Sequence, residues 1–329
     1  MSTGVLGRRF FSRTVQTALS VLAIAVTNFA LLKLVPGDVA DVIAGEAGSA
    51  TPEYMADLRS RFGLDQSFLE QLWLYVTKLI QLDLGHSFRH NMPVGDLILD
   101  RLGPTMLLMG AAILISVVLG VIFGVLSASK VNGWIDNIVS VVALVSFATP
   151  VFWSGLMAIV VFSVWLGWLP SGGIETIGAS HSGWARVADI GKHMVMPVGA
   201  LSLFFLATYT RLMRASMLEV LGQDFITTAR AKGLSERVVV FKHALRNALL
   251  PLVTMIGLQM GTLVGGSVLV ETVFGWPGLG RLAFESVFQR DLNVLLGILF
   301  ISSLVVLVTN ILVDIVYVVV DPRIEGKGH

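Results

Sequence analysis

The chain has 329 residues, of which 55% are hydrophobic and only 14% are charged. Soluble domains carry roughly 25% charged residues, so this composition argues against an ordinary soluble globular fold. The 23 basic and 22 acidic residues give a net charge of +1, which excludes a strongly basic nucleic-acid-binding protein. The chain contains no cysteine, which excludes disulfide scaffolds, cysteine nucleophiles and thiolate metal sites.

Six stretches are long and apolar enough to cross a bilayer, whose hydrocarbon core of about 30 Å requires about 20 apolar residues in a helix. We therefore predict an all-α integral membrane protein with six transmembrane helices, at 14–34, 105–127, 137–166, 193–213, 249–269 and 294–320. The third stretch is long and contains Pro150, where we expect a kink or a break.

The first stretch has two alternative interpretations. It follows Arg8, Arg9 and Arg13, as the apolar core of a secretory signal peptide does. Its apolar run is longer than the roughly 7–15 residues of a cleavable signal, which favours an uncleaved signal-anchor. The Arg8-Arg9 pair also faintly resembles a twin-arginine signal, but the favoured interpretation is that these are basic residues on the inner side of a span.

The charges between the spans indicate the orientation of the chain. With the N-terminus inside, the inner side carries 13 basic and six acidic residues, and the outer side carries nine basic and 15 acidic residues. Cytoplasmic loops are enriched in Lys and Arg, so we expect cytoplasmic tails at 1–13 and 321–329 and an extracytoplasmic segment at 35–104. Lys33 closes the first span and is expected to extend its amine to the membrane surface.

The extracytoplasmic segment is predicted to be small and helical. Thr51-Pro52-Glu53 is typical of a helix start, and a second helical pattern runs from Phe68 to Leu82. His86 and His90 are four residues apart, as two metal ligands on one helix are, but no third ligand accompanies them. We therefore predict no metal site.

The most informative segment lies between the fourth and fifth spans, at 214–248, and is too charged to enter the bilayer. Two short helices fit it. Asp224 is placed to cap the first, Arg230 and Lys232 fall in its last turn, and Gly233 is placed to end it. Ser235 is placed to cap the second.

One face of the first short helix carries Ile226, Ala229 and Gly233. The small residues Ala229 and Gly233 are expected to let the surface of another protein approach the backbone, which is typical of a docking site and not of an active site. A basic loop that only obeys the charge rule for cytoplasmic loops is the alternative. A DNA-binding helix-turn-helix is disfavoured, since two spans tether the segment to the membrane.

Motifs along the chain resemble one family. TARAKGLSER at 228–237, followed by HALRNALLP at 243–251, is similar to the EAA loop of the inner-membrane permease subunits of ABC importers. Thr227 and Thr228 stand where the general motif has Glu and Ala, a variant that the peptide/nickel group tolerates. Further matches to the B-type subunit of that group are LVPGD at 34–38, LDLGHSF at 82–88, ETVFGWPGLG at 271–280 and DPR at 321–323.

The resemblance implies the type I ABC-importer permease fold and a position in the bacterial cytoplasmic (inner) membrane. It implies three kinds of partner besides the lipid bilayer: a second homologous permease subunit, two cytoplasmic ATPase subunits and an extracytoplasmic solute-binding protein. Dipeptides or oligopeptides are the expected solutes, with nickel chelates, glutathione and sugars as alternatives. The residues that it assigns to ATPase coupling are Asp224, Ile226, Ala229, Arg230, Lys232, Gly233, Leu234 and Ser235.

The chain has no phosphate-binding loop of the form GxxxxGK[ST], so we expect ATP and Mg²⁺ to be bound by partner subunits, with no cofactor and no enzyme activity in this chain. A secondary transporter or channel that works alone is the competing hypothesis, and it predicts inverted repeats and charges at the membrane midplane. A membrane-embedded enzyme is a third, and it requires clustered His or carboxylate side chains. Neither pattern is found in the sequence.

Several residues within the predicted spans are candidates for the translocation pathway or a subunit interface. They are Gly257, Gly261, Gly265, Asn310 and Asp314. The glycines also fit close helix packing within the chain, and the acid also fits a structural role near the membrane surface.

Two further glycine-containing motifs also have more than one interpretation. Gly120 and Gly124 on the second span favour close helix packing within the chain. Trp276, Pro277 and Gly278 follow the fifth span and are candidates for an outer gate. The alternative for that turn is a tryptophan anchored at the membrane interface.

Overall fold

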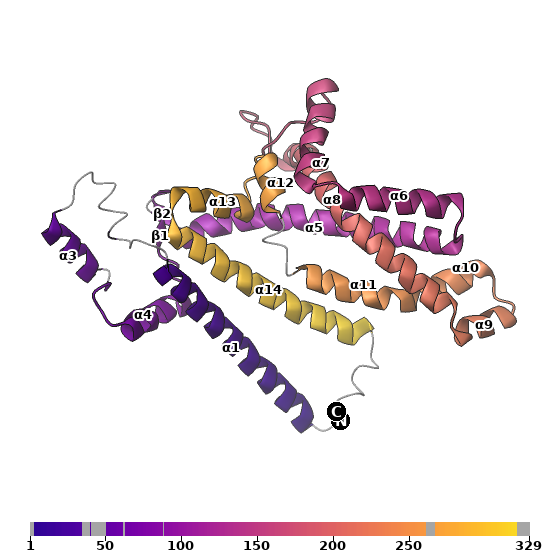
Figure 1. The fold of residues 1–329 in the computed structure, drawn as a ribbon, viewed down its shortest axis with the longest axis horizontal. Coiled ribbons are helices and arrows are strands. Elements are labelled where there is room, and N and C mark those ends of the chain that lie inside the picture. Colours follow the sequence, from indigo (N-terminus) through magenta and orange to yellow (C-terminus); the bar gives the residue numbers. More distant parts are fainter. Residues whose placement is uncertain are drawn as a thin grey trace. The chain divides into compact units, whose positions relative to one another are not determined.

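The computed structural model describes residues 3–34, 40, 51–61, 63–87, 89–260 and 267–320. In this part of the chain helices dominate, and the sheet is a single antiparallel pair, in which β1 (His86–Ser87) lies beside β2 (Met92–Pro93) (Figure 1). The chain divides into two compact units: Met1–Asp100 with Ala283–Leu307, and Arg101–Leu282 with the remainder of the chain.

The first unit contains α1 (Thr3–Leu34), α3 (Pro52–Arg61) and α4 (Phe68–Ile80). It also contains the β-pair, the start of α5 (Val94–Ser129), most of α13 (Leu279–Gln289) and the first part of α14 (Leu292–Val320). The two helices predicted after the first span are confirmed. α3 begins after Thr51, whose Oγ1 accepts a hydrogen bond from the backbone N of Tyr54 at 3.3 Å.

A capping box sets the start of α4. Ser67 Oγ accepts a hydrogen bond from the backbone N of Glu70 at 3.4 Å, and the Glu70 carboxylate accepts one from the backbone N of Ser67 at 2.9 Å. The hydrogen bonds from the Ser67 hydroxyl and backbone hold the pKa of Glu70 below its ordinary value.

The β-pair is attached to the start of α14 by side-chain hydrogen bonds. Ser87 Oγ donates to Asp291 Oδ2 at 2.5 Å, and Asn293 Nδ2 donates to the carbonyl of His86 at 3.0 Å. Among the described residues, no group of three His, Cys, Asp or Glu side chains is placed to hold a metal ion.

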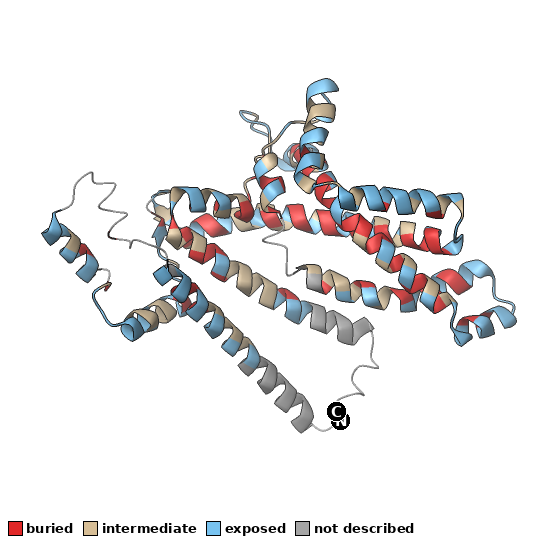
Figure 2. Ribbon diagram, viewed as in Figure 1, coloured by how far each residue is buried: buried red, intermediate tan, exposed pale blue. Residues whose placement is uncertain are grey.

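The second unit is built around α8 (Gly183–Leu221) and the rest of α5. Around them lie α6 (Trp134–Ala148), α7 (Val151–Ala158) with the π-helical segment η1 (Ile159–Trp165), α9 (Asp224–Ala231), α10 (Glu236–Val238), the π-helical segment η2 (Val239–Ala244), α11 (Leu245–Met260) and α12 (Val268–Val273). Figure 2 shows that buried residues follow α5 and α8 in this unit.

Two glycines bring α5 and α8 into close contact. A Cβ at Gly120 would lie 2.7 Å from Cβ of Tyr209, and a Cβ at Gly124 would lie 2.5 Å from Cβ of Met213. Both distances are below any tolerable contact, so only glycine fits. The packing role predicted for these two glycines is confirmed.

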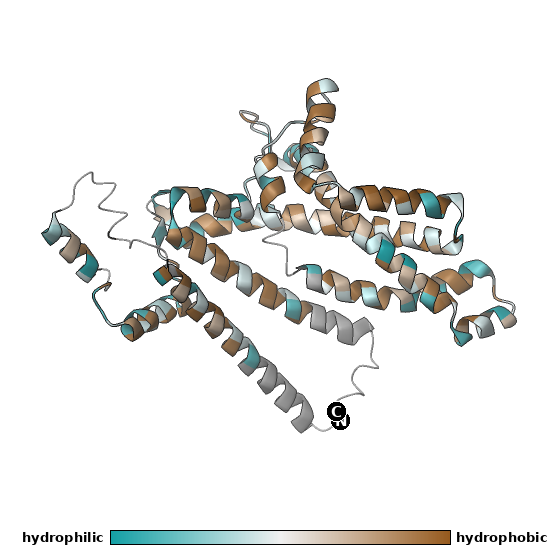
Figure 3. Ribbon diagram, in the orientation of Figure 1, coloured by the Kyte–Doolittle hydropathy of each residue, from teal (hydrophilic) through white to brown (hydrophobic). Residues whose placement is uncertain are grey.

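Four described helices are long and apolar enough to cross a membrane: Val94–Ser129, Gly183–Leu221, Glu236–Gly257 and Leu292–Leu312. Figure 3 shows the apolar residues that cover α6 and α14. Of the six predicted spans, the described residues confirm four, or five if α6 and α7–η1 together form one span. The apolar part described for α1, Leu19–Leu31, is shorter than a full span.

The predicted third span is not one continuous helix. α6 ends at Ala148, α7 begins at Val151, and the two helices bend by 100°. Pro150 is the N-cap of α7, and its ring disfavours helical backbone at Thr149, which is extended at ψ 125°. The break expected at this proline is therefore confirmed, and α6 and α7–η1 form either one broken span or a re-entrant pair of helices.

Candidate functional site

The segment between α8 and α11, which we name the corner segment (residues 222–244), begins with a sharp turn. α8 ends at Leu221, and Gln223 is the N-cap of α9, with extended backbone. The prediction that Asp224 caps this helix is wrong, because Asp224 is already its first helical residue. Its carboxylate there still favours the positive end of the helix.

The predicted end of α9 is confirmed. Arg230 lies in the last turn, Lys232 is the C-cap, and Gly233 follows with a φ of +76°, in the left-handed region that favours glycine. A Cβ added at Gly233 would meet no described atom within 4 Å. Backbone conformation therefore favours glycine here, and the space above it is open.

The second predicted short helix is not a separate element. Ser235 is the N-cap of α10, as predicted, but the backbone then stays helical through η2 and α11 as far as Met260. No Gly or Pro interrupts the sequence from Leu234 to Leu250, so nothing local ends the helix there. The charged residues that follow Glu236 thus belong to the helix that continues into the fifth predicted span.

The structure corrects the predicted docking face of α9. Ile226 and Ala229 are only 0% and 6% exposed, and they belong to the buried core that also contains Val239 and Val240 of η2. These two side chains therefore attach α9 to η2 and do not form an outer surface. The short helix is held on an apolar anchor that belongs to this chain.

The outward surface of the corner segment is made by other residues. Asp224, Lys232, Leu234 and Ser235 are exposed. Large apolar side chains in the segment are exposed as well, namely Phe225, Leu234, Val238 and Phe241. Exposed apolar side chains next to charges are typical of a surface that contacts another protein.

An ion pair closes the turn at Gly233. Arg230 Nη2 donates to Glu236 Oε1 at 2.8 Å, and Nε donates to Oε2 at 3.2 Å, so the guanidinium joins the end of α9 to the start of α10. The two side chains are 45% and 62% exposed, so solvent screens the pair. The pair fixes the geometry of the turn more than it stabilises the fold.

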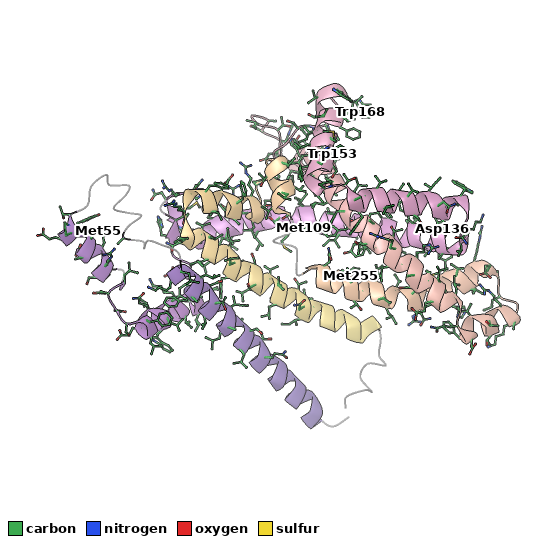
Figure 4. The ribbon with its side chains drawn as sticks, viewed as in Figure 1. Met55, Met109, Asp136, Trp153, Trp168 and Met255 are labelled. Carbon is green, nitrogen blue, oxygen red and sulfur yellow. The ribbon has the colours of Figure 1, made fainter. Side chains whose placement is uncertain are left out.

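A partly buried ion pair lies near the end of α8 that leads to the corner segment. Arg214 Nε and Nη2 donate to the two carboxylate oxygens of Asp136 at 2.7 and 2.8 Å, and the Ser127 hydroxyl donates to the same carboxylate. Figure 4 labels Asp136 near the beginning of α6. The pair joins α6 and the end of α5 to α8. The sequence analysis missed it, although opposite charges at the ends of two spans were a usable signal.

A second buried carboxylate organises the segment after the fifth predicted span, at 267–281, which we name the buried turn. Glu271 is 0% exposed. Its Oε1 accepts hydrogen bonds from Thr105 Oγ1 at 2.7 Å and Ser267 Oγ at 2.8 Å, and its Oε2 accepts one from the backbone N of Arg281 at 2.9 Å. Sequence reasoning quoted Glu271 only as part of a motif.

The candidate gate residues lie within this buried turn. Trp276 is 0% exposed, and its Nε1 donates to the carbonyl of Pro104 at 3.0 Å. The interpretation of Trp276 as an anchor at the membrane interface is therefore wrong, because the side chain lies in the protein interior. A Cβ at Gly278 would lie 2.2 Å from Cδ of Glu271, so the backbone packs directly on the carboxylate.

The other candidates are only partly described. Gly257 is buried in α11 and Asn310 is exposed on α14. Gly261, Gly265 and the side chain of Asp314 lie outside the described residues.

Two family models match the chain. The binding-protein-dependent transport system inner membrane component matches residues 120–326, and the N-terminal domain of such membrane components matches residues 7–109. The chain belongs to this family of transport permeases. The prediction of an ABC-importer permease is thereby confirmed, and the family match does not support the competing hypothesis of a transporter that works alone.

Similar proteins and a solved structure support this family assignment. The oligopeptide transport system permease protein AppB of Bacillus subtilis is 39% identical, with 95% of this chain and 98% of AppB covered. The dipeptide transport system permease protein DppB of Alkalihalophilus pseudofirmus is also 39% identical, with 93% and 95% covered. A chain of the inward-facing methionine transporter MetNI shares the fold, with a TM-score of 0.54, 21% identity, and 68% of this chain and 96% of that chain covered.

The family assignment makes this permease the membrane component of an ABC importer. In such importers separate ATPase subunits hydrolyse ATP, so the prediction that this chain is not an enzyme is confirmed by its family.

Proposed function

We propose that this permease carries dipeptides or oligopeptides and that its corner segment receives the movement of an ATPase subunit. The first part is supported by relatives named for oligopeptide and dipeptide transport that match over nearly their whole length. The single observation that carries the second part is the construction of α9, a short exposed helix fixed by Ile226 and Ala229 to the helix that continues into the membrane.

The proposed assembly contains this chain, a second homologous permease subunit, two ATPase subunits and an extracytoplasmic solute-binding protein in the bacterial inner membrane. Both termini are cytoplasmic in this arrangement. Residues 214–248 then lie on the ATPase side and residues 35–104 on the side of the binding protein. The unequal distribution of charge in the sequence supports this orientation.

Coupling follows from the connections of α9. The helix joins α8 directly to the helix that begins at Glu236, so a force on its exposed surface displaces both. Asp224, Lys232, Leu234 and Ser235 provide the polar and apolar contact surface, while Ile226 and Ala229 transmit the displacement to η2. Packed cores transmit such displacements because they deform little.

The buried turn is proposed to act at the outer gate as one rigid body. Trp276, Pro277 and Gly278 are attached through Glu271 and Pro104 to α12 and α5, which supports movement of the turn with those helices. The stripe at Gly257, Gly261 and Gly265 and the pair Asn310 and Asp314 remain proposed contacts with the pathway or the second permease subunit.

The test of coupling is Gly233→Asp. Asp tolerates the left-handed region better than most residues, so the backbone cost is about 1 kcal/mol, and the added carboxylate occupies the open space where we place the ATPase. Gly222→Ala is the matched control, because Gly222 has a φ of −84° and its Cβ would meet only ordinary contacts.

In cells that depend on this importer for peptide uptake, Gly233→Asp should lower uptake at least about tenfold and release the ATPase subunits during purification, while Gly222→Ala retains both. Retention of uptake and of the ATPase subunits by Gly233→Asp would contradict the assignment. The substrate is tested separately, by asking whether the binding protein loaded with a dipeptide, a nickel chelate, glutathione or a sugar stimulates ATP hydrolysis by the reconstituted importer.

A further inference from the structure

A cleft of about 540 Å³ opens within the first unit, where the C-terminal end of α1 meets α4. Its walls carry apolar side chains of both helices and of α14, namely Phe29, Leu74, Tyr75, Leu79 and Leu296. Two lysines, Lys33 and Lys78, line the same cleft. The cleft thus combines an apolar floor with cationic groups.

An apolar groove of about 420 Å³ shares Leu79 with this cleft. It runs between α1, α4 and α14, and the side chains that line it are Val21, Leu22, Ala25, Val76, Leu79, Ile80, Leu82, Phe300 and Leu304. None of them is polar. The two cavities are adjacent at Leu79, the one apolar along α1 and the other charged where α1 ends, and we name the two together the α1–α4 groove.

The charges of the α1–α4 groove favour an anion. Lys33 Nζ donates to the Gln71 side chain and lies 5.7 Å from the centroid of the Phe29 ring, and no described acidic side chain pairs with Lys33 or Lys78. Asp83 also lines the cleft, but one oxygen of its carboxylate already accepts a hydrogen bond from the backbone N of Gly85 at 2.9 Å. Two amines face one carboxylate, so the cleft is positively charged.

The length of the groove matches one leaflet of a bilayer. From Val21 to Lys33, the first and last residues of α1 that line the groove, α1 rises about 18 Å at 1.5 Å per residue, close to half of the ~30 Å hydrocarbon core. Lys33 then lies at the level of the phosphates. α4 is also expected to lie at the membrane surface, at the same depth as Lys33. Its exposed apolar side chains include Leu69, Trp73 and Ile80, and amphipathic helices with tryptophan lie at the membrane surface.

We infer that the α1–α4 groove binds an anionic phospholipid, with one acyl chain along Val21, Ala25 and Phe300 and the headgroup phosphate at Lys33 and Lys78. The inference rests on the proposed placement of α1 as a membrane span. The bound lipid fills the space between α1, α4 and α14 and thereby stabilises the first unit.

The test measures lipid binding to the purified full-length chain by native mass spectrometry, with dioleoyl phosphatidylglycerol and dioleoyl phosphatidylcholine as probes. The unsubstituted chain should bind one phosphatidylglycerol in preference to phosphatidylcholine. Lys78→Glu should weaken phosphatidylglycerol binding about fivefold or more, since one Lys near a membrane surface contributes ~1 kcal/mol. Lys192→Glu, an exposed lysine outside the groove, is the matched control and should change nothing.

Two further arms separate the headgroup from the acyl chain. Ile80→Ser changes an exposed side chain of the groove and should weaken both lipids equally. Glycerol 3-phosphate, which has the phosphate without the chains, should not displace the bound lipid. If glycerol 3-phosphate displaced the lipid, the site would recognise phosphate alone, and the lipid assignment would be overturned.

Equal binding of the two lipids by the unsubstituted chain, or equal effects of Lys78→Glu and Lys192→Glu, would overturn the inference. Extraction of the membranes with alkaline carbonate distinguishes this failure from failure of the proposed function. A chain that stays in the membrane and supports peptide uptake, but does not prefer phosphatidylglycerol, contradicts the lipid site alone.

Discussion

The corner segment and the buried turn both depend on a glycine, but for opposite physical reasons. Gly233 adopts a positive φ and has open space above it, whereas the backbone at Gly278 packs so closely on Glu271 that a Cβ would lie 2.2 Å from the carboxylate carbon. In the corner segment the polar side chains are exposed. In the buried turn the carboxylate of Glu271 is fully enclosed and hydrogen-bonded within the chain.

This difference shows which region is complete within this chain. In the buried turn, the carboxylate of Glu271 has its hydrogen-bond partners within this chain, as buried polar groups require. The corner segment packs internally through Ile226 and Ala229 of α9 and through Val239, Val240 and Ala244 of η2, and it leaves apolar side chains such as Phe225 and Phe241 exposed. A surface of that kind is expected where a second protein binds.

The largest effect on stability is expected at Gly278. Gly278→Ala overpacks the buried turn and should destabilise the protein by about 3 kcal/mol, which corresponds to a melting temperature lower by roughly 6–12 °C. Gly199→Ala is the control, because a Cβ at Gly199 on α8 would meet nothing within 4 Å. Thermal melting of the purified permease checks both. Equal melting temperatures would show that the turn is not tightly packed.

An intermediate effect is expected at the ion pair between Asp136 and Arg214, whose side chains are 4% and 30% exposed. Asp136→Asn leaves the guanidinium without its carboxylate and should cost about 2 kcal/mol, less than for a fully buried pair because solvent reaches Arg214. Combining Asp136→Asn with Arg214→Gln should cost less than the sum of the two single changes. Additive costs in this double-mutant cycle would mean that the pair does not couple α6 to α8.

The smallest effect on stability is expected at the exposed pair of the corner segment. Arg230→Ala removes an ion pair that solvent screens and should lower the melting temperature only slightly, an effect that added salt reduces further. Melting curves at low and high salt measure it. A loss as large as that of Asp136→Asn would contradict the description of the corner segment as a surface open to a partner.

Local chemistry made parts of this structure predictable from the sequence. The end of α9 at Gly233 and the break at Pro150 follow from the backbone preferences of single residues, and both are confirmed. The close helix packing at Gly120 and Gly124 was predicted from their spacing of four residues on one helix face.

Contacts between distant residues were not predictable in the same way. The enclosure of Glu271 depends on Thr105, which is 166 positions away, and on Arg281, and no local pattern contains that information. Ile226 and Ala229 were correctly placed on one face of α9, but the pattern cannot say whether that face meets this chain or another. Only the position of η2 settles that it meets this chain.

The orientation and the partner of the corner segment can be tested together with one cysteine. The chain has no cysteine of its own, so Thr227→Cys places a single thiol on the exposed surface of α9. Ile177→Cys, at a residue 101% exposed before α8, is the control for the opposite side of the membrane.

The decisive measurement combines cross-linking from Thr227→Cys in the assembled importer with labelling by a maleimide that does not cross membranes. We predict a cross-link to the ATPase subunit, labelling of Thr227→Cys in inside-out vesicles only, and labelling of Ile177→Cys in right-side-out vesicles only. Labelling of Thr227→Cys from the outside, with no cross-link to the ATPase, would contradict the proposal that the corner segment couples ATP hydrolysis to transport.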